Sequence, residues 1–179
     1  MKVVIATPLY PPDIAEPAPY VKELATRLAG EHQVTIVAYG RLPEQIPGVT
    51  LIAVPKDRPL AERLMAFTRA LRAAARHADV VIVENGASVE VPAILVSLTG
   101  KTPLIFHLGD IAAHTVAEQN LGRHVIERIT RAHARATVDD RPMARPEILP
   151  FEPEPAAEQK LWEESWQRHL VLLTSYFHA

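Results

Sequence analysis

The chain has 179 residues, of which 48% are hydrophobic and 22% are charged, and its formal net charge is -2. This length suits one sizeable hydrophobic core and leaves no room for a second full domain. The weak charge argues against nucleic-acid binding, and the absence of cysteine excludes disulfides, thiolate metal sites and a cysteine nucleophile. No apolar stretch reaches the roughly 18 residues of a membrane span, and no signal peptide is recognisable, so we expect a cytoplasmic protein.

A buried strand, a stiff loop and a helix open the chain. Residues 3–6 are continuously apolar, which is typical of a strand covered on both faces. Residues 7–19 hold five prolines and cannot be the interior of a strand or helix. A helix is predicted from Pro19 to Gly30, because proline suits the first turn of a helix and glycine its end. Ligands of open α/β sheets bind beyond the carboxyl ends of the strands, so this loop is the first candidate site.

Strands and helices then alternate along the chain. Further strands are predicted at residues 33–38, 50–54, 80–83 and 103–107. One helix is expected to run as far as about His77, with Asp57 as its N-cap, and another to run from Ser88 to Gly100. This alternation predicts an α/β fold with a mostly parallel sheet, joined by right-handed crossovers.

The last third of the chain is less regular. Residues 115–135 favour a helix, and residues 137–138 favour a short last strand. Residues 141–155 hold five prolines and are predicted to be an extended connector. The predicted divisions are therefore a domain at 1–140, a connector at 141–155 and a helix at 156–179.

The predicted C-terminal helix has an apolar stripe that must be buried. The stripe consists of Trp162, Trp166, Leu170, Leu173 and Phe177. It either packs on the body of this chain or is the interface with a partner chain, including a second copy. Both interpretations stay open.

Basic side chains are frequent at residues 123–135, where Glu127 is the only acid. They suit a solvated helix face. The alternative is that they attract a phosphate or an anionic membrane surface, which would make peripheral membrane contact possible.

Polar residues follow three of the predicted strands, and the ends of parallel strands meet at one edge of a sheet. No glycine-rich dinucleotide loop, Walker motif, zinc-ligand histidine pair or nucleophile elbow is present. The candidate site residues are Tyr10, Asp13, Ala15 and Glu16 in the first loop, Glu84, Asn85 and Gly86 after residues 80–83, and His107, Gly109 and Asp110 after residues 103–106.

Several of these candidates also have a simpler interpretation. His107 suits a hydrogen bond to neighbouring backbone, and Asp110 suits a cap on the next segment. Glu16 suits a solvated charge at a helix start, and the Asn85-Gly86 pair is a turn sequence in its own right.

Several segments resemble the N-terminal domain of family-four glycosyltransferases of the GT-B fold. The match starts with residues 1–14 and the helix containing residues 20–25. It continues, in the same order and at similar spacing, through residues 78–83, 92–95 and 100–110, so that it covers residues 1 to about 112. The C-terminal tryptophan helix is more loosely similar to the last helix of that family.

The resemblance implies a Rossmann-like three-layer α/β/α sandwich, half of a GT-B fold, that binds a sugar acceptor. It implies no cofactor, and a nucleotide sugar as the donor substrate. His107 matches the histidine that lies near the reacting sugar in that family. Ala15 and Glu16 stand where the family has two glycines that approach the donor phosphates. A carboxylate there repels a phosphate, and alanine restricts the positive φ values that glycine permits.

The resemblance also implies that the donor-binding domain of the family is missing, because it has no room between Val138 and Ala156. The chain then resembles a truncated GT-B protein whose last helix packs back on its first domain. Such a protein would transfer sugar only when another chain supplies the donor domain. The alternative is a non-catalytic descendant that binds a sugar or a protein and has a regulatory role. A structural homodimer that uses residues 156–177 as its interface is a third interpretation, compatible with either of the other two.

Overall fold

A computed structural model describes residues 1–15, 17–41, 43–107, 129, 132, 135–138 and 155–177. The chain divides into two compact units, Met1–Thr137 and Val138–Ala179, which we describe separately. The predicted helix at 115–135 and the connector at 141–155 lie almost wholly outside the described residues. The division into a domain, a connector and a helix therefore stays a prediction.

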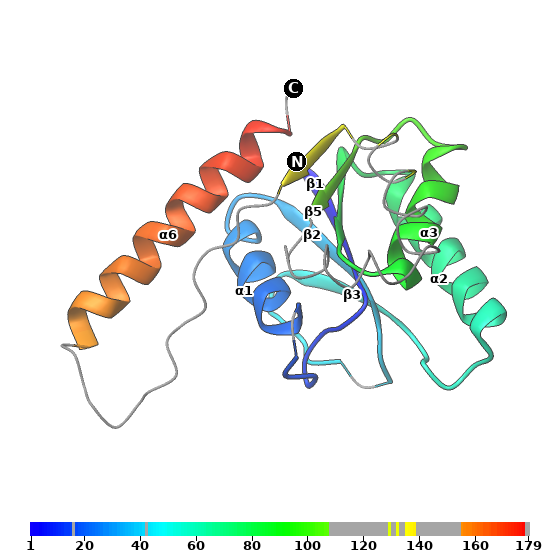
Figure 1. The fold of residues 1–179 in the computed structure, drawn as a ribbon, viewed down its shortest axis with the longest axis horizontal. Helices are drawn as coiled ribbons and strands as arrows, with labels where there is room; N and C mark the ends of the chain where they lie inside the picture. The colour runs from blue at the N-terminus through cyan, green and yellow to red at the C-terminus, as the bar shows by residue number, and fades with distance from the viewer. Residues whose placement is uncertain are drawn as a thin grey trace. The chain divides into compact units, whose positions relative to one another are not determined.

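The first unit is built on a parallel sheet (Figure 1). Its strands are β1 (Lys2–Thr7), β2 (Gln33–Tyr39), β3 (Val49–Val54), β4 (Val80–Glu84), β5 (Leu104–His107) and β6 (Ala136–Val138). They lie in the order β3-β2-β1-β4-β5-β6, and the pairs from β3 to β5 are all parallel. The prediction of an α/β fold with a mostly parallel sheet is confirmed.

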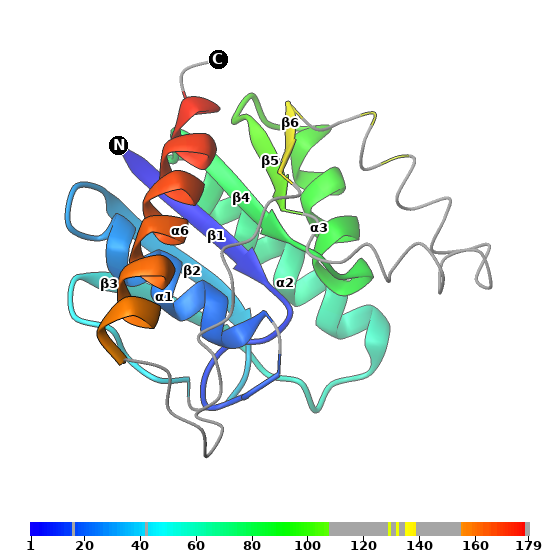
Figure 2. The ribbon, with the colours of Figure 1, turned by 60° about the vertical axis from the view of Figure 1, so that its left-hand side comes forward.

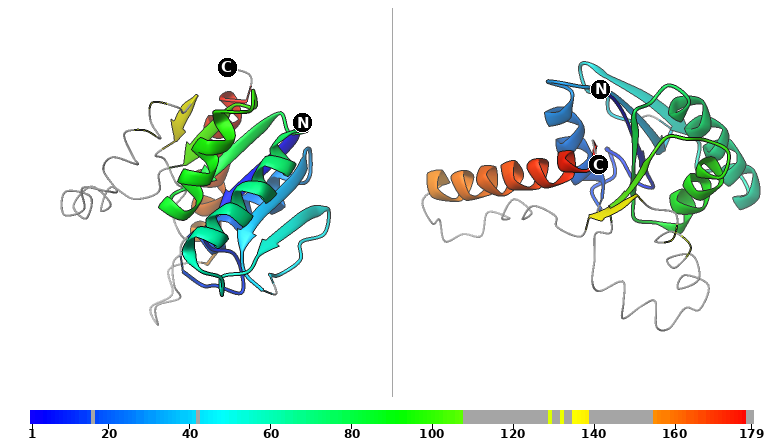
Figure 3. Two further views of the ribbon diagram at one scale, coloured as in Figure 1. Left: turned by 90° about the vertical axis from the view of Figure 1, so that its right-hand side faces the viewer. Right: turned by 90° about the horizontal axis from the view of Figure 1, so that it is seen from above.

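Helices cover both faces of this sheet. Helix α1 (Ala18–Leu28) packs on one face against β1 and β2, whereas α2 (Leu60–Ala75) and α3 (Ala87–Ser97) lie side by side on the other (Figures 2 and 3). The arrangement is the Rossmann-like three-layer α/β/α sandwich that the family resemblance implies.

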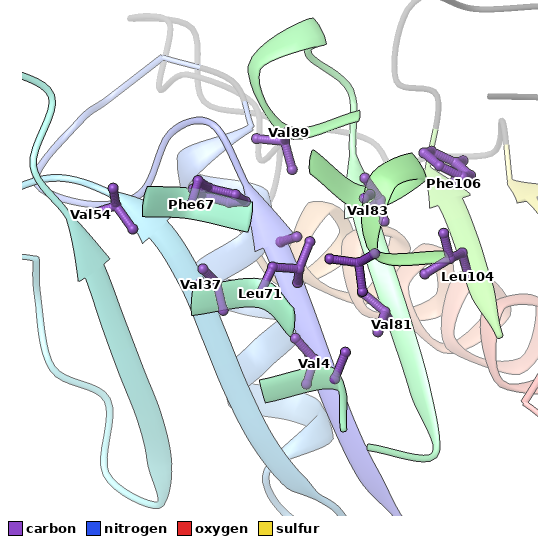
Figure 4. Packing of buried hydrophobic residues seen from close by; sticks show 14 of the residues in the cluster. Val4, Val37, Val54, Phe67, Leu71, Val81, Val83, Val89, Leu104 and Phe106 are labelled. Carbon is purple, nitrogen blue, oxygen red and sulfur yellow. The ribbon is translucent and has the colours of Figure 1, made fainter. Parts of the chain in front are cut away.

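The main core lies between the sheet and the pair α2 and α3 (Figure 4). Phe67 and Leu71 of α2 and Val89 of α3 are fully buried there. They pack on alternate residues of the strands, because successive side chains of a strand point to opposite faces. These strand residues are Val4, Val37, Val81, Val83, Leu104 and Phe106. The continuously apolar strands of the sequence are thus buried on both sides, as predicted.

One predicted helix cap is wrong. Asp57 does not cap α2, because the N-cap is Pro59 and Asp57 instead forms an ion pair with Arg41 at 2.6 Å. Helix α3 begins at Ala87, one residue before the predicted start at Ser88, and Gly86 is its N-cap.

The second unit contains helix α6 (Pro155–Ser175). Trp166 and Leu173 of α6 and Phe177, just after it, are buried, and the Trp162 ring meets the Trp166 ring edge-on at 6.1 Å between centroids. The predicted helix and its stripe are present, while what covers the stripe stays a prediction. Among the helices that the structure describes, none combines the length and apolar character that crossing a membrane requires.

Candidate functional site

The strand order reverses between β1 and β4, since β2 and β3 lie to one side of β1 and β5 to the other side of β4. At such a switch point the connections leave the sheet in opposite directions, and the carboxyl ends of the two strands border a crevice. Three of the predicted groups of site residues belong to the strands at this edge. The first loop follows β1, Glu84 ends β4 and His107 ends β5.

Glu84 and His107 lie side by side at the ends of two adjacent strands, because the parallel register of β4 and β5 pairs them. Nδ1 of His107 lies 3.1 Å from Oε1 and 3.2 Å from Oε2 of Glu84. An ionised carboxylate only accepts hydrogen bonds, so with Glu84 ionised the hydrogen of this bond is on Nδ1. Glu84 therefore fixes which ring nitrogen of His107 is the donor and orients the other, Nε2, away from the carboxylate.

Tyr20, in the first turn of α1, completes this group. Its ring stacks on the His107 imidazole with 4.6 Å between centroids and an interplanar angle of 23°. The imidazole is thus held by a carboxylate at its edge and by an aromatic ring on its face, which restricts its rotation. An oriented imidazole of this kind is suited to exchange a proton with a ligand or to bind a hydroxyl group.

Both side chains of the pair are fully buried. Burial of polar groups costs free energy that pairing only partly offsets. A fully buried Glu–His pair therefore stabilises the fold less than hydrophobic residues of similar volume. Because His107 is covered, a ligand reaches its ring only when a covering group moves away.

A second buried acid, Glu90, lies beside the end of β4. Its Oε1 accepts a hydrogen bond of 2.9 Å from the backbone N–H of Gly86, and its side chain is almost fully buried. Gly86 has a φ of 152°, and a Cβ there would lie 3.1 Å from Cγ of Pro8 in the first loop. Gly86 is therefore enclosed between the first loop and the start of α3. Asn85, before it, is half-buried.

The first loop is attached to its surroundings through several contacts. Asp13 forms a 2.7 Å ion pair with Lys56, and the carbonyl of Ala15 accepts a 2.9 Å hydrogen bond from the N–H of Ala18. The Tyr10 side chain is buried with its hydroxyl unpaired. Burial, reinforced by the nearby Glu44 carboxylate, raises the pKa of this hydroxyl to about 12.

The structure thus brings some of the predicted site residues together and leaves others unplaced. Glu84 and His107 are in direct contact, and Gly86 follows on the same edge. Glu16, Gly109 and Asp110 lie outside the described residues, so their predicted roles stay predictions. Within the described part of the chain, no group of three or more acidic or histidine side chains could hold a metal ion.

Two residues of this site were not predicted from the sequence. Tyr20 was assigned only to a helix, because nothing in a sequence shows which turn of a helix returns to a distant strand. Glu90 was also not predicted, because it lies four residues after the N-cap Gly86, whereas the recognisable capping box has Ser or Thr at the N-cap and an acid three residues later.

Comparison with known proteins is informative for the fold alone. The chain matches no protein-family model and no curated protein. Among solved structures, it is similar to a protein of Listeria monocytogenes named as a UDP-N-acetylglucosamine 2-epimerase, with a TM-score of 0.53 and 16% identity. It is also similar to the C-terminal domain of the coenzyme A biosynthesis bifunctional protein CoaBC, with a TM-score of 0.51 and 11% identity.

The extent of these matches differs. The first covers 78% of this chain but 38% of the Listeria protein, so the chain spans well under half of that protein's length. The second covers 97% of this chain and 96% of the CoaBC domain. At such low identities the likeness establishes the Rossmann-like fold, and one fold serves many functions.

Proposed function

We propose that the Met1–Thr137 unit is a glycosyltransferase-like acceptor domain, which binds a sugar acceptor at the carboxyl ends of β1, β4 and β5. Sugar transfer from a nucleotide sugar then requires a donor domain supplied by another chain. In this proposal His107 is the group that contacts the reacting hydroxyl, and Glu84 orients its ring.

The observation that carries this proposal is the buried pair of Glu84 and His107. It lies at the edge of the sheet where α/β proteins bind ligands, and His107 is the residue that matches the histidine of family-four glycosyltransferases. Hydrophobic residues would fill the same space at lower cost, so a role in binding explains why these polar groups are present. The likeness to a protein named for sugar-nucleotide chemistry is consistent with this, on the level of the fold.

A non-catalytic descendant is the second candidate, and the first loop favours it. In that loop Ala15 and Glu16 replace the two glycines of the family, and the Ala15 carbonyl already accepts the hydrogen bond that the Ala18 N–H donates. A loop of this kind cannot approach a donor phosphate as two glycines can. Such a protein would bind a sugar or a protein at the same edge and regulate another process.

The experiment that separates the two candidates is affinity purification of the tagged chain from its native host at low salt, with the co-purified chains identified by mass. A chain with a donor-type Rossmann domain, recovered in equal amount, supports the split transferase. The complex is then assayed for transfer from a panel of nucleotide sugars.

The assay includes two matched variants. His107→Gln is expected to lower transfer at least about a hundredfold, which is the lower range for loss of a general acid or base. His77→Gln, a change at an exposed histidine after α2, is expected to leave transfer unchanged. Recovery of the bait alone contradicts the split transferase and favours the non-catalytic candidate. Transfer that survives His107→Gln contradicts the role proposed for His107.

A further inference from the structure

Two helices begin at the switch point, and both N-termini are poorly suited to an anion. Helix N-termini usually attract phosphate, because their first N–H groups lack partners within the helix. In α3, however, the N–H of the N-cap residue Gly86 is bonded to Glu90. In α1, the N–H of Ala18 is bonded to Ala15, and Pro17 and Pro19 have no N–H to offer.

Charge at this edge also opposes an anion. Glu84 and Glu90 place two buried carboxyl groups beside the end of β4. Three cations, one in α1 and two in the loops after β2 and β3, are each paired with an acid. These pairs are Lys22 with Glu44 at 2.6 Å, Arg41 with Asp57 at 2.6 Å and Lys56 with Asp13 at 2.7 Å. The two buried carboxyl groups and the bond to the Gly86 N–H thus make the place beside Gly86 less suited to an anion than to a neutral or cationic group.

We propose that Glu90 is a specificity-determining residue that closes the start of α3 to phosphate, so that the ligand bound at this edge presents hydroxyl or ammonium groups and no phosphate. The proposal deepens the proposed function and rests on it, since it names the class of acceptor. Glu90 acts in two ways, because its carboxyl oxygen occupies the Gly86 N–H and its negative charge repels an anion at the same place.

The test is a titration of the ¹⁵N-labelled full chain with inorganic phosphate, followed through the Gly86 amide resonance at constant ionic strength. We expect no saturable shift in the wild-type chain. Glu90→Ala frees the Gly86 N–H and removes the charge, so it should give a saturable shift of the Gly86 resonance. Its phosphate affinity should exceed any affinity of the wild-type chain by at least about tenfold, as expected for one hydrogen bond to an anion.

Two further variants isolate the cause. Glu90→Gln keeps an oxygen that accepts the Gly86 hydrogen bond, so it should bind phosphate less well than Glu90→Ala. Glu62→Ala removes an exposed acid from the first turn of α2 and should leave the Gly86 resonance unaffected. The same spectra show whether each variant is folded.

A saturable shift of Gly86 in the wild-type chain overturns the proposal, even if Glu90→Ala fails to fold. Folded Glu90→Ala without any gain of phosphate binding overturns it as well, and shows that Glu90 is a helix cap and nothing more. Neither result bears on whether a donor-domain partner exists. The proposed function is refuted separately, by the purification and transfer assay.

Discussion

Replacement of Glu84 by leucine removes the carboxylate that faces His107 while keeping a side chain of similar bulk. The two contacts at 3.1 and 3.2 Å share one Nδ1–H, so they count as a single hydrogen bond to a carboxylate. Such bonds contribute about 1.5–3 kcal/mol, and loss of one partner from a fully buried pair typically costs about 3–5 kcal/mol. We therefore expect Glu84→Leu to lower the free energy of unfolding by about 3 kcal/mol.

The assay is urea unfolding at neutral pH, followed by circular dichroism. Glu84→Gln keeps an oxygen that accepts from Nδ1–H and should cost only about 1 kcal/mol. Glu62→Leu, at an exposed acid of α2, should change stability by no more than about 0.5 kcal/mol.

A double variant completes the test. Glu84→Leu combined with His107→Leu should lower the free energy of unfolding by less than the sum of the single changes. The reason is that the second change removes a buried group that the first has deprived of its Glu84 partner. A cost for Glu84→Leu equal to that of Glu62→Leu would refute the account of the buried pair. Strict additivity of the two changes at Glu84 and His107 would refute it too.

Three further predictions concern the first loop and its neighbours. Gly86→Ala should lower stability by about 2 kcal/mol in thermal unfolding, because of the φ of 152° and the short contact of the new Cβ with Pro8. Gly30→Ala should cost little, because the nearest atom to its new Cβ is the Arg27 carbonyl oxygen at 3.6 Å; equal effects of the two changes would argue against an enclosed Gly86. Burial raises the pKa values of Tyr10 and Tyr39 to about 12, whereas tyrosines of the unfolded chain ionise near pH 10. Stability should therefore be undiminished below pH 10 and fall between pH 10 and 12. An absorbance titration in which every tyrosine ionises near pH 10 would contradict this. Tyr10→Phe removes a buried hydroxyl without a partner and should raise the free energy of unfolding by about 1 kcal/mol, so a destabilised variant would show that this hydroxyl is satisfied in solution.

The parallel sheet could be predicted from the sequence because its strands are short, continuously apolar runs separated by helical patterns. Each of the first five predicted strands lies within one or two residues of the observed one. The helix beginnings were harder to predict, since a capping side chain has competing partners. Asp57 lies in a suitable place for a cap, yet the cation Arg41 takes its carboxylate instead.

The candidate site could be located from the sequence only as a set of strand ends. That set included Glu84 and His107, which were expected to line one crevice and which the structure places in contact. Their direct contact depends on the register between β4 and β5, which no pattern along the chain specifies. The contributions of Tyr20 and Glu90 depend on how α1 and α3 are placed on the sheet, and those positions are set by tertiary packing.

The central claim, that the acceptor binds at the carboxyl edge of the sheet, is tested most directly by titrating the ¹⁵N-labelled chain with neutral monosaccharides and mapping the amide shifts. The account predicts saturable shifts at residues 84–86 and 107, and unchanged resonances at His77 and Asp79, which precede β4 at the opposite edge. His107→Gln should weaken the binding. Shifts centred on His77 and Asp79, or no shift with any sugar of the panel, would contradict the account.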